Sequence, residues 1–513
     1  MSRFVPCLVP PPLRSEDGRL SPSSVLLDYT AYISADAVSN GTTAGGNLSN
    51  GCPIHVSFCL APAPRLSYLC VHFPGPAAGS GIGTVIGPAA GTPAVQCVNE
   101  PPRVISTHAD LALIRVPIPG ALRIFNEYDY FVYTARPQPG ASSLDLLPKA
   151  HSGFRDKDVA ILRDSHRYVI ACLRNTLKSE ELFSFQLYDS NTRRWSTRLL
   201  RVENPAERDE VLPIPFKTAT EVLFHNTTKV VTLGGPNGTV GWVDLWRGIL
   251  FCNVLDEMPV LRDMPLPKPA RSNRRDFCIG CPHSFRDITV AAGKQQGSKV
   301  IKYVEMETRP GNVLSSRSSE SDSDSDDEAV ADYWTATIWT MPVPISSSWK
   351  DWHKDCTIDV TNIIIDNPSH SELLLRLPRH SADPEDARYG LMRMTTAHPT
   401  LGLGINGDVI SFLSKEDVRG ARGWVIAVNM TSQKLNGVAE LDIRKNSYFQ
   451  RYYVPTEISK YLTKATGEAG TLLKTTSSNR KSIGARKMEF NVELTSKAPS
   501  TVQELTILLH TLQ

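Results

Sequence analysis

The stretch from Gly241 to Pro267 constrains the fold of this chain more than any other segment. It holds an apolar run of strand length at 249–252, then an acidic, turn-rich segment, then a second extended segment at 261–267. An apolar run bounded by turn residues is the pattern of a strand in an antiparallel sheet. The stretch therefore predicts a strand–turn–strand unit with this structural signature: Trp242, Asp244, Trp246, Arg247 and Gly248.

Two other segments repeat the shape of this unit. Residues 185–195 and 425–438 each read as a strand, a polar turn built on Asp or Asn, and a return strand. Such hairpins are typical of β-propeller blades, each of which is a four-stranded antiparallel sheet. The sequence thus predicts an all-β, propeller-like architecture in which residues 25–460 form six or seven blades. The alternative is another antiparallel fold, because hairpins in any such fold share this shape.

Composition divides the chain into further parts. Residues 1–24 are broken by prolines and are predicted to be a disordered leader. Residues 311–331 are rich in Ser, Asp and Glu and cannot bury apolar area, so they are predicted to be a disordered insertion within the 25–460 domain. Residues 461–513 are predicted to be a polar tail that ends in an amphipathic helix, with further short helices near the C-terminus.

Bulk properties exclude several classes of protein. The formal net charge of +2 supplies no global field for nucleic acid or membrane, which argues against both as partners. No apolar run of 18 residues is present, and prolines interrupt the first residues where a signal peptide would be apolar. The 10 cysteines are scattered, which favours reduced thiols and a cytoplasmic or nuclear location.

The acidic insertion contains a run of serines next to carboxylates. This context suits an acid-directed kinase, and each added phosphate would bring about −1.5 to −2 charges. The alternative is a loop that serves only to keep the protein soluble. The predicted phosphorylation sites are Ser319, Ser321, Ser323 and Ser325.

Cys278 and Cys281 have the spacing of half a zinc site, with His283 close by. Zinc normally needs two such pairs, and no second Cys-x-x-Cys exists in the sequence, so a structural or incidental role is favoured over a metal site. The basic cluster around Arg274 is either a nuclear-import signal or a solvated loop. The acidic residues near Asp244 are assigned to turns rather than to a catalytic pair.

No established catalytic motif is present in the sequence. The chain has no P-loop, no His-Glu-x-x-His and no Gly-x-Ser-x-Gly. We therefore predict no catalytic, cofactor-binding or metal-binding residues and no cofactor.

Several long motifs are spread over residues 25–445: 26–33, 56–61, 71–75, 110–116, 129–133, 241–250, 261–267, 286–290, 302–305 and 424–428. Together they resemble the plant family called domain of unknown function 1618. The resemblance implies a family that is expanded in grasses, has no established activity and is associated with development and stress responses. It also implies a propeller-like fold, and it carries over no functional residues.

These features favour an intracellular protein-interaction scaffold with an unknown protein partner, because propeller loops on a rigid disc carry partner specificity. The alternative is a hydrolase or lyase with its site in the propeller channel. Converging His, Asp or Glu side chains in the channel would favour the enzyme. A third option, an adaptor for protein degradation, is disfavoured because no F-box-like helical segment precedes the strands.

Overall fold

The computed structural model describes most of the residues between 22 and 462. The chain divides into two compact units, Met1–Thr466 and Gly467–Gln513, and every described residue lies in the first. The acidic insertion, the predicted C-terminal helix and most of the predicted leader lie outside the described residues. The described ranges are 22–34, 38–74, 100–119, 127–150, 153–176, 182–203, 225–275, 280–293, 295, 297–310, 332–343, 351–375, 387–392, 394–403, 407–415, 422–442 and 453–462.

The described part of the chain is built mainly of strands. Its α-helices are α1 (Pro368–Leu375) and α2 (Ala387–Met392), and a 3₁₀ turn at Ile458–Tyr461 follows the last strand. The strands are β1 (Val25–Asp28), β2 (Tyr32–Ile33), β3 (Ala44–Asn47), β4 (Pro53–Cys59), β5 (Leu66–His72), β6 (Arg103–His108), β7 (Leu111–Pro117), β8 (Tyr128–Thr134), β9 (Ser143–Leu146), β10 (Val159–Asp164), β11 (Arg167–Asn175), β12 (Leu182–Asp189), β13 (Arg194–Glu203), β14 (Lys229–Gly234), β15 (Thr239–Asp244), β16 (Gly248–Asn253), β17 (Leu261–Pro265), β18 (Arg286–Ala292), β19 (Lys299–Pro310), β20 (Asp332–Pro342), β21 (His353–Asp359), β22 (Thr395–Leu401), β23 (Val409–Lys415), β24 (Arg422–Asn429), β25 (Lys434–Asp442) and β26 (Tyr453–Thr456).

Most of the sheets are antiparallel meanders of consecutive strands. Three four-stranded sheets have the orders β6-β7-β8-β9, β18-β19-β20-β21 and β22-β23-β24-β25. The eight-stranded sheet consists of two such runs, β10 to β13 and β14 to β17. These runs are joined by a short parallel contact between β13 and β17, in which Val202 faces Leu261 and Glu203 faces Arg262.

The remaining sheet brings together the two ends of the described chain. Its order is β26-β1-β5-β4-β3, with β2 paired to β5. The antiparallel register of β1 and β26 places Val25 opposite Thr456 and Asp28 opposite Tyr453. The first and last strands of the described chain therefore close one sheet, as in many propellers.

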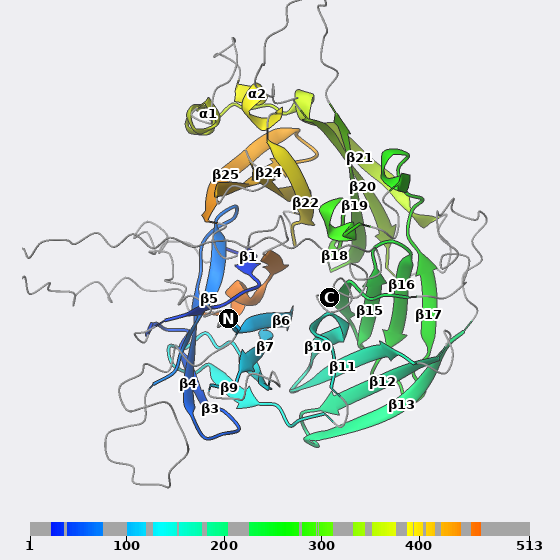
Figure 1. The fold of residues 1–513 in the computed structure, drawn as a ribbon. Coiled ribbons are helices and arrows are strands. Elements are labelled where there is room, and N and C mark those ends of the chain that lie inside the picture. The colour runs from blue at the N-terminus through cyan, green and yellow to red at the C-terminus, as the bar shows by residue number, and fades with distance from the viewer. Residues whose placement is uncertain are drawn as a thin grey trace, which may run out of the picture. The chain divides into compact units, whose positions relative to one another are not determined.

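The hydrophobic cores lie between successive sheets. Leu113 of β7 shares a core with Ile161 of β10, and Trp242 of β15 shares one with the β10–β13 run. The sheet of the last run, β22 to β25, packs against the sheet that contains β1, because Leu26 of β1 shares a core with Leu413 of β23. Figure 1 shows the sheets of this unit around a common centre, with β6, β10 and β18 toward the middle. The all-β, propeller-like prediction is confirmed.

The three similar hairpins found in the sequence occupy equivalent positions. The segments 249–252 and 261–267 fall on β16 and β17, and β12–β13, β16–β17 and β24–β25 are each the third and fourth strands of their runs. Two of these hairpins also share the chemistry of the turn: Asp189 Oδ1 accepts from the backbone N–H of Asn191 at 2.8 Å, and Asn429 Oδ1 accepts from Ser432 N–H at 2.9 Å. The similarity therefore reflects a shared place in the four-stranded run together with turn chemistry.

Candidate functional sites: a central cavity and an exposed outer strand

The signature tryptophan of β15 is part of the core. Trp242 is fully buried between the β10–β13 and β14–β17 runs. Its indole Nε1 donates to the carbonyl of Asp158 at 2.8 Å. This bond satisfies the polar end of a large buried ring, so Trp242 joins the two runs of the eight-stranded sheet rather than facing a ligand.

The next signature residues shape the turn between β15 and β16. The two carboxylate oxygens of Asp244 accept from the backbone N–H groups of Trp246 and Asn226, each at 2.9 Å. Burial raises the pKa of this carboxyl, although the backbone hydrogen bonds oppose the shift. Position 248 has room only for glycine, because a β-carbon there would clash with the Met264 carbonyl oxygen at 2.5 Å. The carboxylate of Asp244 is thus part of the turn itself.

Trp246 takes part in a buried ionic network with β18 and β19. The guanidinium of Arg286 lies 4.8 Å from the centre of a Trp246 ring and donates to Glu305 Oε1 at 2.7 Å. It also donates to the Leu245 carbonyl at 2.9 Å. Asn273 Nδ2 donates to the same Glu305 oxygen at 2.9 Å. Several resemblance motifs therefore meet in this one network between sheets.

The other predicted sites form no metal or redox centre in the described residues. Cys281 is an exposed free thiol, and Cys278 lies outside the described residues. A search of the described residues finds no group of three or more His, Cys, Asp or Glu arranged to hold a metal ion. Arg274 lies in a short 3₁₀ turn, Ser272–Arg275, and its Nε donates to the Pro269 carbonyl at 3.3 Å. The serines 319, 321, 323 and 325 lie outside the described residues.

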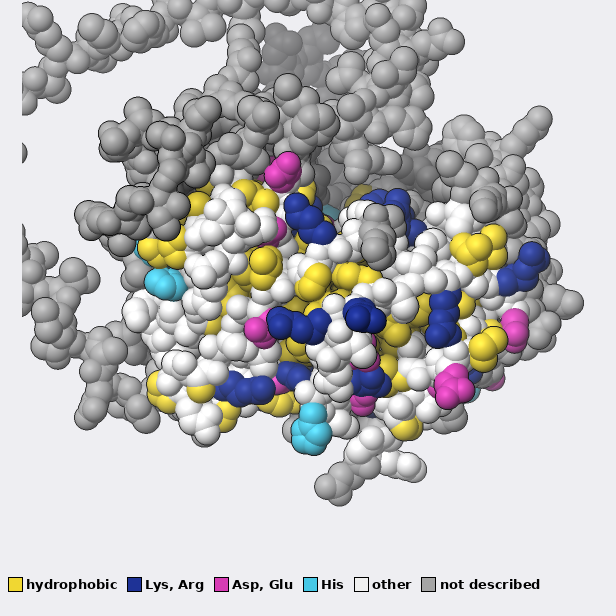
Figure 2. Space-filling view, turned by 90° about the horizontal axis from the view of Figure 1, so that it is seen from below, with side chains coloured by type: hydrophobic (Ala, Val, Ile, Leu, Met, Phe, Trp, Pro, Cys, Tyr) yellow, Lys and Arg dark blue, Asp and Glu magenta, His cyan; other side chains and the backbone are white. Residues whose placement is uncertain are grey.

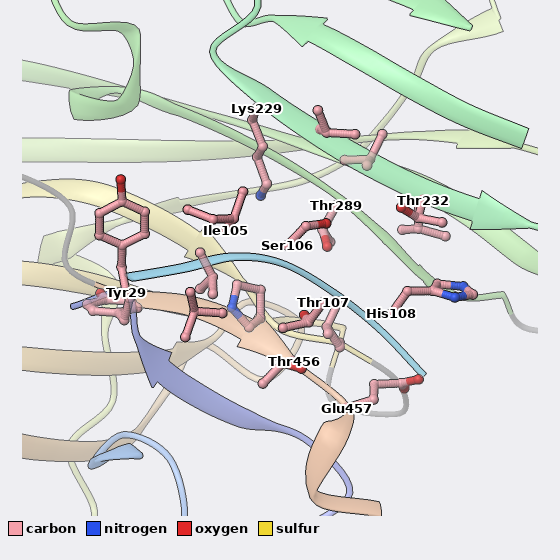
Figure 3. Close-up of a pocket in the computed structure, with 18 of the residues that line it drawn as sticks. Tyr29, Ile105, Ser106, Thr107, His108, Lys229, Thr232, Thr289, Thr456 and Glu457 are labelled. Atoms are coloured by element: carbon pink, nitrogen blue, oxygen red, sulfur yellow. The ribbon is translucent and has the colours of Figure 1, made fainter. Parts of the chain in front are cut away.

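The inner strands surround a cavity of about 1310 Å³. Residues of β6, β10, β14, β18, β22 and β26 all contribute to its wall, so it occupies the centre of the ring of sheets. In Figure 3, Tyr29 is drawn at one end of the pocket, and His108 and Glu457 are drawn at the other. The cavity is therefore the candidate ligand site that the fold itself creates.

Side chains of β6 fix its position against β10. Ser106 Oγ accepts from the backbone N–H of Ile161 at 3.2 Å, and His108 Nδ1 accepts from the backbone N–H of Arg163 at 3.0 Å. A step of two residues along β6, from Ser106 to His108, corresponds to a step of two residues along β10, from Ile161 to Arg163, so the two strands run in the same direction. Burial, together with the nearby Lys299 ammonium, lowers the pKa of His108 to about 4, so its imidazole is neutral at pH 7.

The carboxylates of the cavity wall are engaged by cations. Asp156 accepts from Arg115 Nη1 at 2.7 Å, and Glu457 accepts from Lys460 Nζ at 2.6 Å. Arg103, which also lines the cavity, donates to the hydroxyl of Tyr29 at 3.2 Å. The lining contains five Lys or Arg residues and two Asp or Glu residues, so it carries an excess of three positive charges.

The outer strand β13 forms a second candidate surface. One edge of β13 pairs with β12 along residues 194–201. The other edge pairs with β17 only at Val202 and Glu203, so over residues 194–201 this second edge is open. No other strand of the described chain pairs with this edge. Leu199 is 56% exposed on it. The exposed basic residues on β13 or next to it are Arg193, Arg194, Arg198 and Arg201.

The view from below confirms the basic character of this side. β13 runs along the lower side of the unit in Figure 1. Figure 2, which is seen from below, shows Lys and Arg side chains spread across that face among apolar ones. The sequence-based prediction named the propeller channel only as the site of the alternative enzyme and selected none of its residues, and it did not select β13. The run of arginines at 193–201 was a signal that could have indicated β13, whereas the cavity residues come from strands that are distant in the sequence.

The sheets, the closing strand pair and the central cavity define an all-β, propeller-like class of protein. Within that class, residues 242–410 match the model of the family described as "Protein of unknown function (DUF1618)". The match spans β16 to β22 and the second half of β15, including the turn and the ionic network around Trp246. It confirms the resemblance for this part of the chain. None of the helices in the described residues has the length and apolar character needed to cross a bilayer.

Comparison with other proteins adds little about activity. A search of curated proteins gives no match. Among solved structures, the chain is similar to the WD40 domain of SCAP from fission yeast, with 10% identity, a TM-score of 0.29, and coverage of 82% of this chain and 86% of the other. It is also similar to the periplasmic gluconolactonase PpgL of Pseudomonas aeruginosa, with 10% identity, a TM-score of 0.26, and coverage of 68% and 87%. The strand pairing described above defines the fold.

Proposed function

We propose that this chain is a six-bladed propeller-type interaction scaffold and that β13 binds an extended, acidic segment of a partner protein. The blade number follows if each run of the eight-stranded sheet is counted as one blade. A location in the cytoplasm or nucleus and a role in development or stress response belong to the same proposal. The role rests on the family resemblance, and the location on the scattered cysteines of the sequence.

The observation that carries the proposal is the open edge of β13 with its arginines. An extended peptide adds to such an edge through main-chain hydrogen bonds, and its side chains alternate between the two faces of the sheet. Four exposed arginines favour carboxylate-bearing partners, because guanidinium groups bind carboxylates in a bidentate manner. Leu199, 56% exposed among them, offers an apolar contact.

The β13 strand is held firmly enough to act as a template. Trp195 Nε1, near its start, donates to the Pro148 carbonyl at 2.9 Å, and the ring lies against Tyr188 and Phe154. Leu200 and Val202, near its end, are buried in the core shared with β14–β17. A template fixed at both ends lowers the ordering cost of binding.

The test measures binding of a labelled peptide in which Glu and Val alternate, by fluorescence anisotropy at low salt. The variant Arg194→Glu/Arg198→Glu should bind at least about tenfold more weakly, because two attractive charges become repulsive. Arg422→Glu, an exposed arginine at the start of β24, is the matched control and should bind as the unmodified protein does. Equal binding by the double variant, or equal binding of a Lys–Val peptide, would contradict the proposal.

A further inference from the structure

His108 presents an unused hydrogen-bond donor at the end of β6. Its Nδ1 accepts from the Arg163 backbone N–H, so the ring proton resides on Nε2. Within the described residues, no protein atom accepts a hydrogen bond from this Nε2. Gly234, whose φ is +69°, lies beside the ring: a β-carbon built there would meet His108 Nε2 at 3.4 Å, an ordinary van der Waals distance. The cavity wall therefore contains a fixed N–H donor.

The ammonium of Lys299 lies near this donor. It donates one hydrogen bond to the carbonyl of Leu233, a neutral oxygen, and the next residue, Gly234, lies beside His108 Nε2, so the ammonium and the imidazole flank the same end of β14. The negative group at this end of the cavity, Glu457, is bound to Lys460 at 2.6 Å. The remaining N–H groups of Lys299 and the His108 Nε2–H together suit a small anion.

Hydroxyl groups line the wall next to this donor pair. Thr107, Thr232 and Thr289 all line the cavity, and none of their hydroxyls bonds another group in the described part of the chain. Figure 3 shows Thr107 and Thr232 close to His108 in the view, with Thr289 farther along the wall. Hydroxyls that can donate and accept match a ligand that itself carries several hydroxyl groups.

We propose that the central cavity binds a small phosphorylated sugar, with its phosphate at Lys299 and His108 and its hydroxyls against Thr232 and Thr289. A space of about 1310 Å³ accommodates a ligand of this size with accompanying water. The excess of positive charge in the lining favours an anion over a neutral sugar. This site is independent of the outer strand β13, so it goes beyond the scaffold proposal.

The experiment uses the full chain and three probes: glucose 6-phosphate, inorganic phosphate and glucose. Glucose 6-phosphate at about 10 mM should raise Tm by about 1–3 °C, with a Kd below about 1 mM by calorimetry. Inorganic phosphate should bind more weakly, and glucose should bind least. Failure of both phosphate-bearing probes to bind, or equal binding of glucose, would overturn the proposal.

Matched variants locate the site. Lys299→Gln should weaken glucose 6-phosphate binding at least about tenfold, because it removes a charge-assisted contact. Thr232→Val should weaken glucose 6-phosphate more than inorganic phosphate, since the hydroxyl is assigned to the sugar. Lys354→Gln, an exposed lysine on β21 outside the cavity, should leave binding unchanged. Unchanged affinity in Lys299→Gln, with the fold intact by circular dichroism, would rule out this site.

Discussion

The Trp246 side chain combines three roles at one position. It is 8% exposed, its Nε1 donates to the Gly280 carbonyl at 3.2 Å, and a ring of it packs against Arg286. Replacing it by a small residue would leave a cavity and would remove the ring that packs against the buried guanidinium of Arg286. The hydrogen bonds of Asp244 that hold the turn would not compensate for these losses.

Replacing Trp246 by Ala should lower the free energy of unfolding by about 3–5 kcal/mol, measured by urea denaturation. Met258→Ala is the control and should change stability by less than about 0.5 kcal/mol, because Met258 is 81% exposed. A Trp246→Ala variant of undiminished stability that lost binding to a partner would instead make Trp246 a binding residue.

His108 should make the stability of the protein depend on pH. Its pKa is lowered to about 4 by burial and by Lys299 and Arg163, against the opposing effect of Asp110, whereas the unfolded value is about 6.5. The unfolded chain therefore binds a proton first as the pH falls. The stability associated with neutral His108 is complete above pH 6.5 and is lost toward pH 4.

Between pH 7 and pH 5 the loss of the His108 contribution should lower the free energy of unfolding by about 2 kcal/mol. The variant His108→Asn keeps an acceptor for the Arg163 N–H and does not titrate. Its free energy of unfolding should therefore fall by about 2 kcal/mol less than that of the unmodified protein over this pH range. Urea denaturation of both proteins at the two pH values measures the difference. Parallel losses in the two proteins would show that His108 is solvated and titrates normally.

At the scale of elements, the hairpin of β19 and β20 carries the acidic insertion at its tip. The pairing continues to Pro310 opposite Asp332, so the two strands are in register up to the residues that bound 311–331. Adjacent paired strands lie about 5 Å apart, a distance that a two-residue turn closes. The hairpin therefore needs no long connection to form.

Replacing residues 311–331 by Asn-Gly should keep Tm within about 2 °C of the unmodified protein, as measured by calorimetry. The same variant should lack any phosphorylation at Ser319, Ser321, Ser323 and Ser325 that mass spectrometry detects in the full chain. Loss of a cooperative unfolding transition would show that the insertion is part of the fold.

The alternation of side chains made many strands predictable. Residues 183–188 alternate in sequence and lie within β12, and the apolar run at 249–252 lies within β16. Turn chemistry was predictable too, because Asp189 and Asp244 cap their own turns. Which sheet faces which was not predictable, since the cores pair residues such as Leu26 and Leu413 that are far apart in the chain.

The residues that line the cavity escaped prediction for a related reason. His108 and Lys299 are separated by two complete runs of strands, and each looks unremarkable in its own segment. Their proximity depends on the direction of β6 relative to β10, which Ser106 and His108 fix through side-chain contacts with backbone N–H groups. Periodicity within a strand gives no information on such contacts between sheets.

At the scale of the whole unit, the contact between β1 and β26 holds the ring of sheets closed. A chain that stops after residue 452 lacks β26 and leaves one edge of β1 without a partner. Such a chain should unfold with a lower Tm and a broader transition than the full protein. A chain that stops after residue 462 keeps β26 and is the matched control. Equal, sharp transitions in both would show that closure is dispensable.

The closing pair also sets the order of events during synthesis. β1 leaves the ribosome first, yet one of its partners, β26, is made more than 420 residues later, since β1 ends at Asp28 and β26 begins at Tyr453. At about 5–20 residues per second, β1 stays half-paired for at least about 20 seconds. During this time its free edge is open to other nascent chains. Growing copies of this protein on one messenger therefore need spacing or a chaperone to avoid exchanging their first strands.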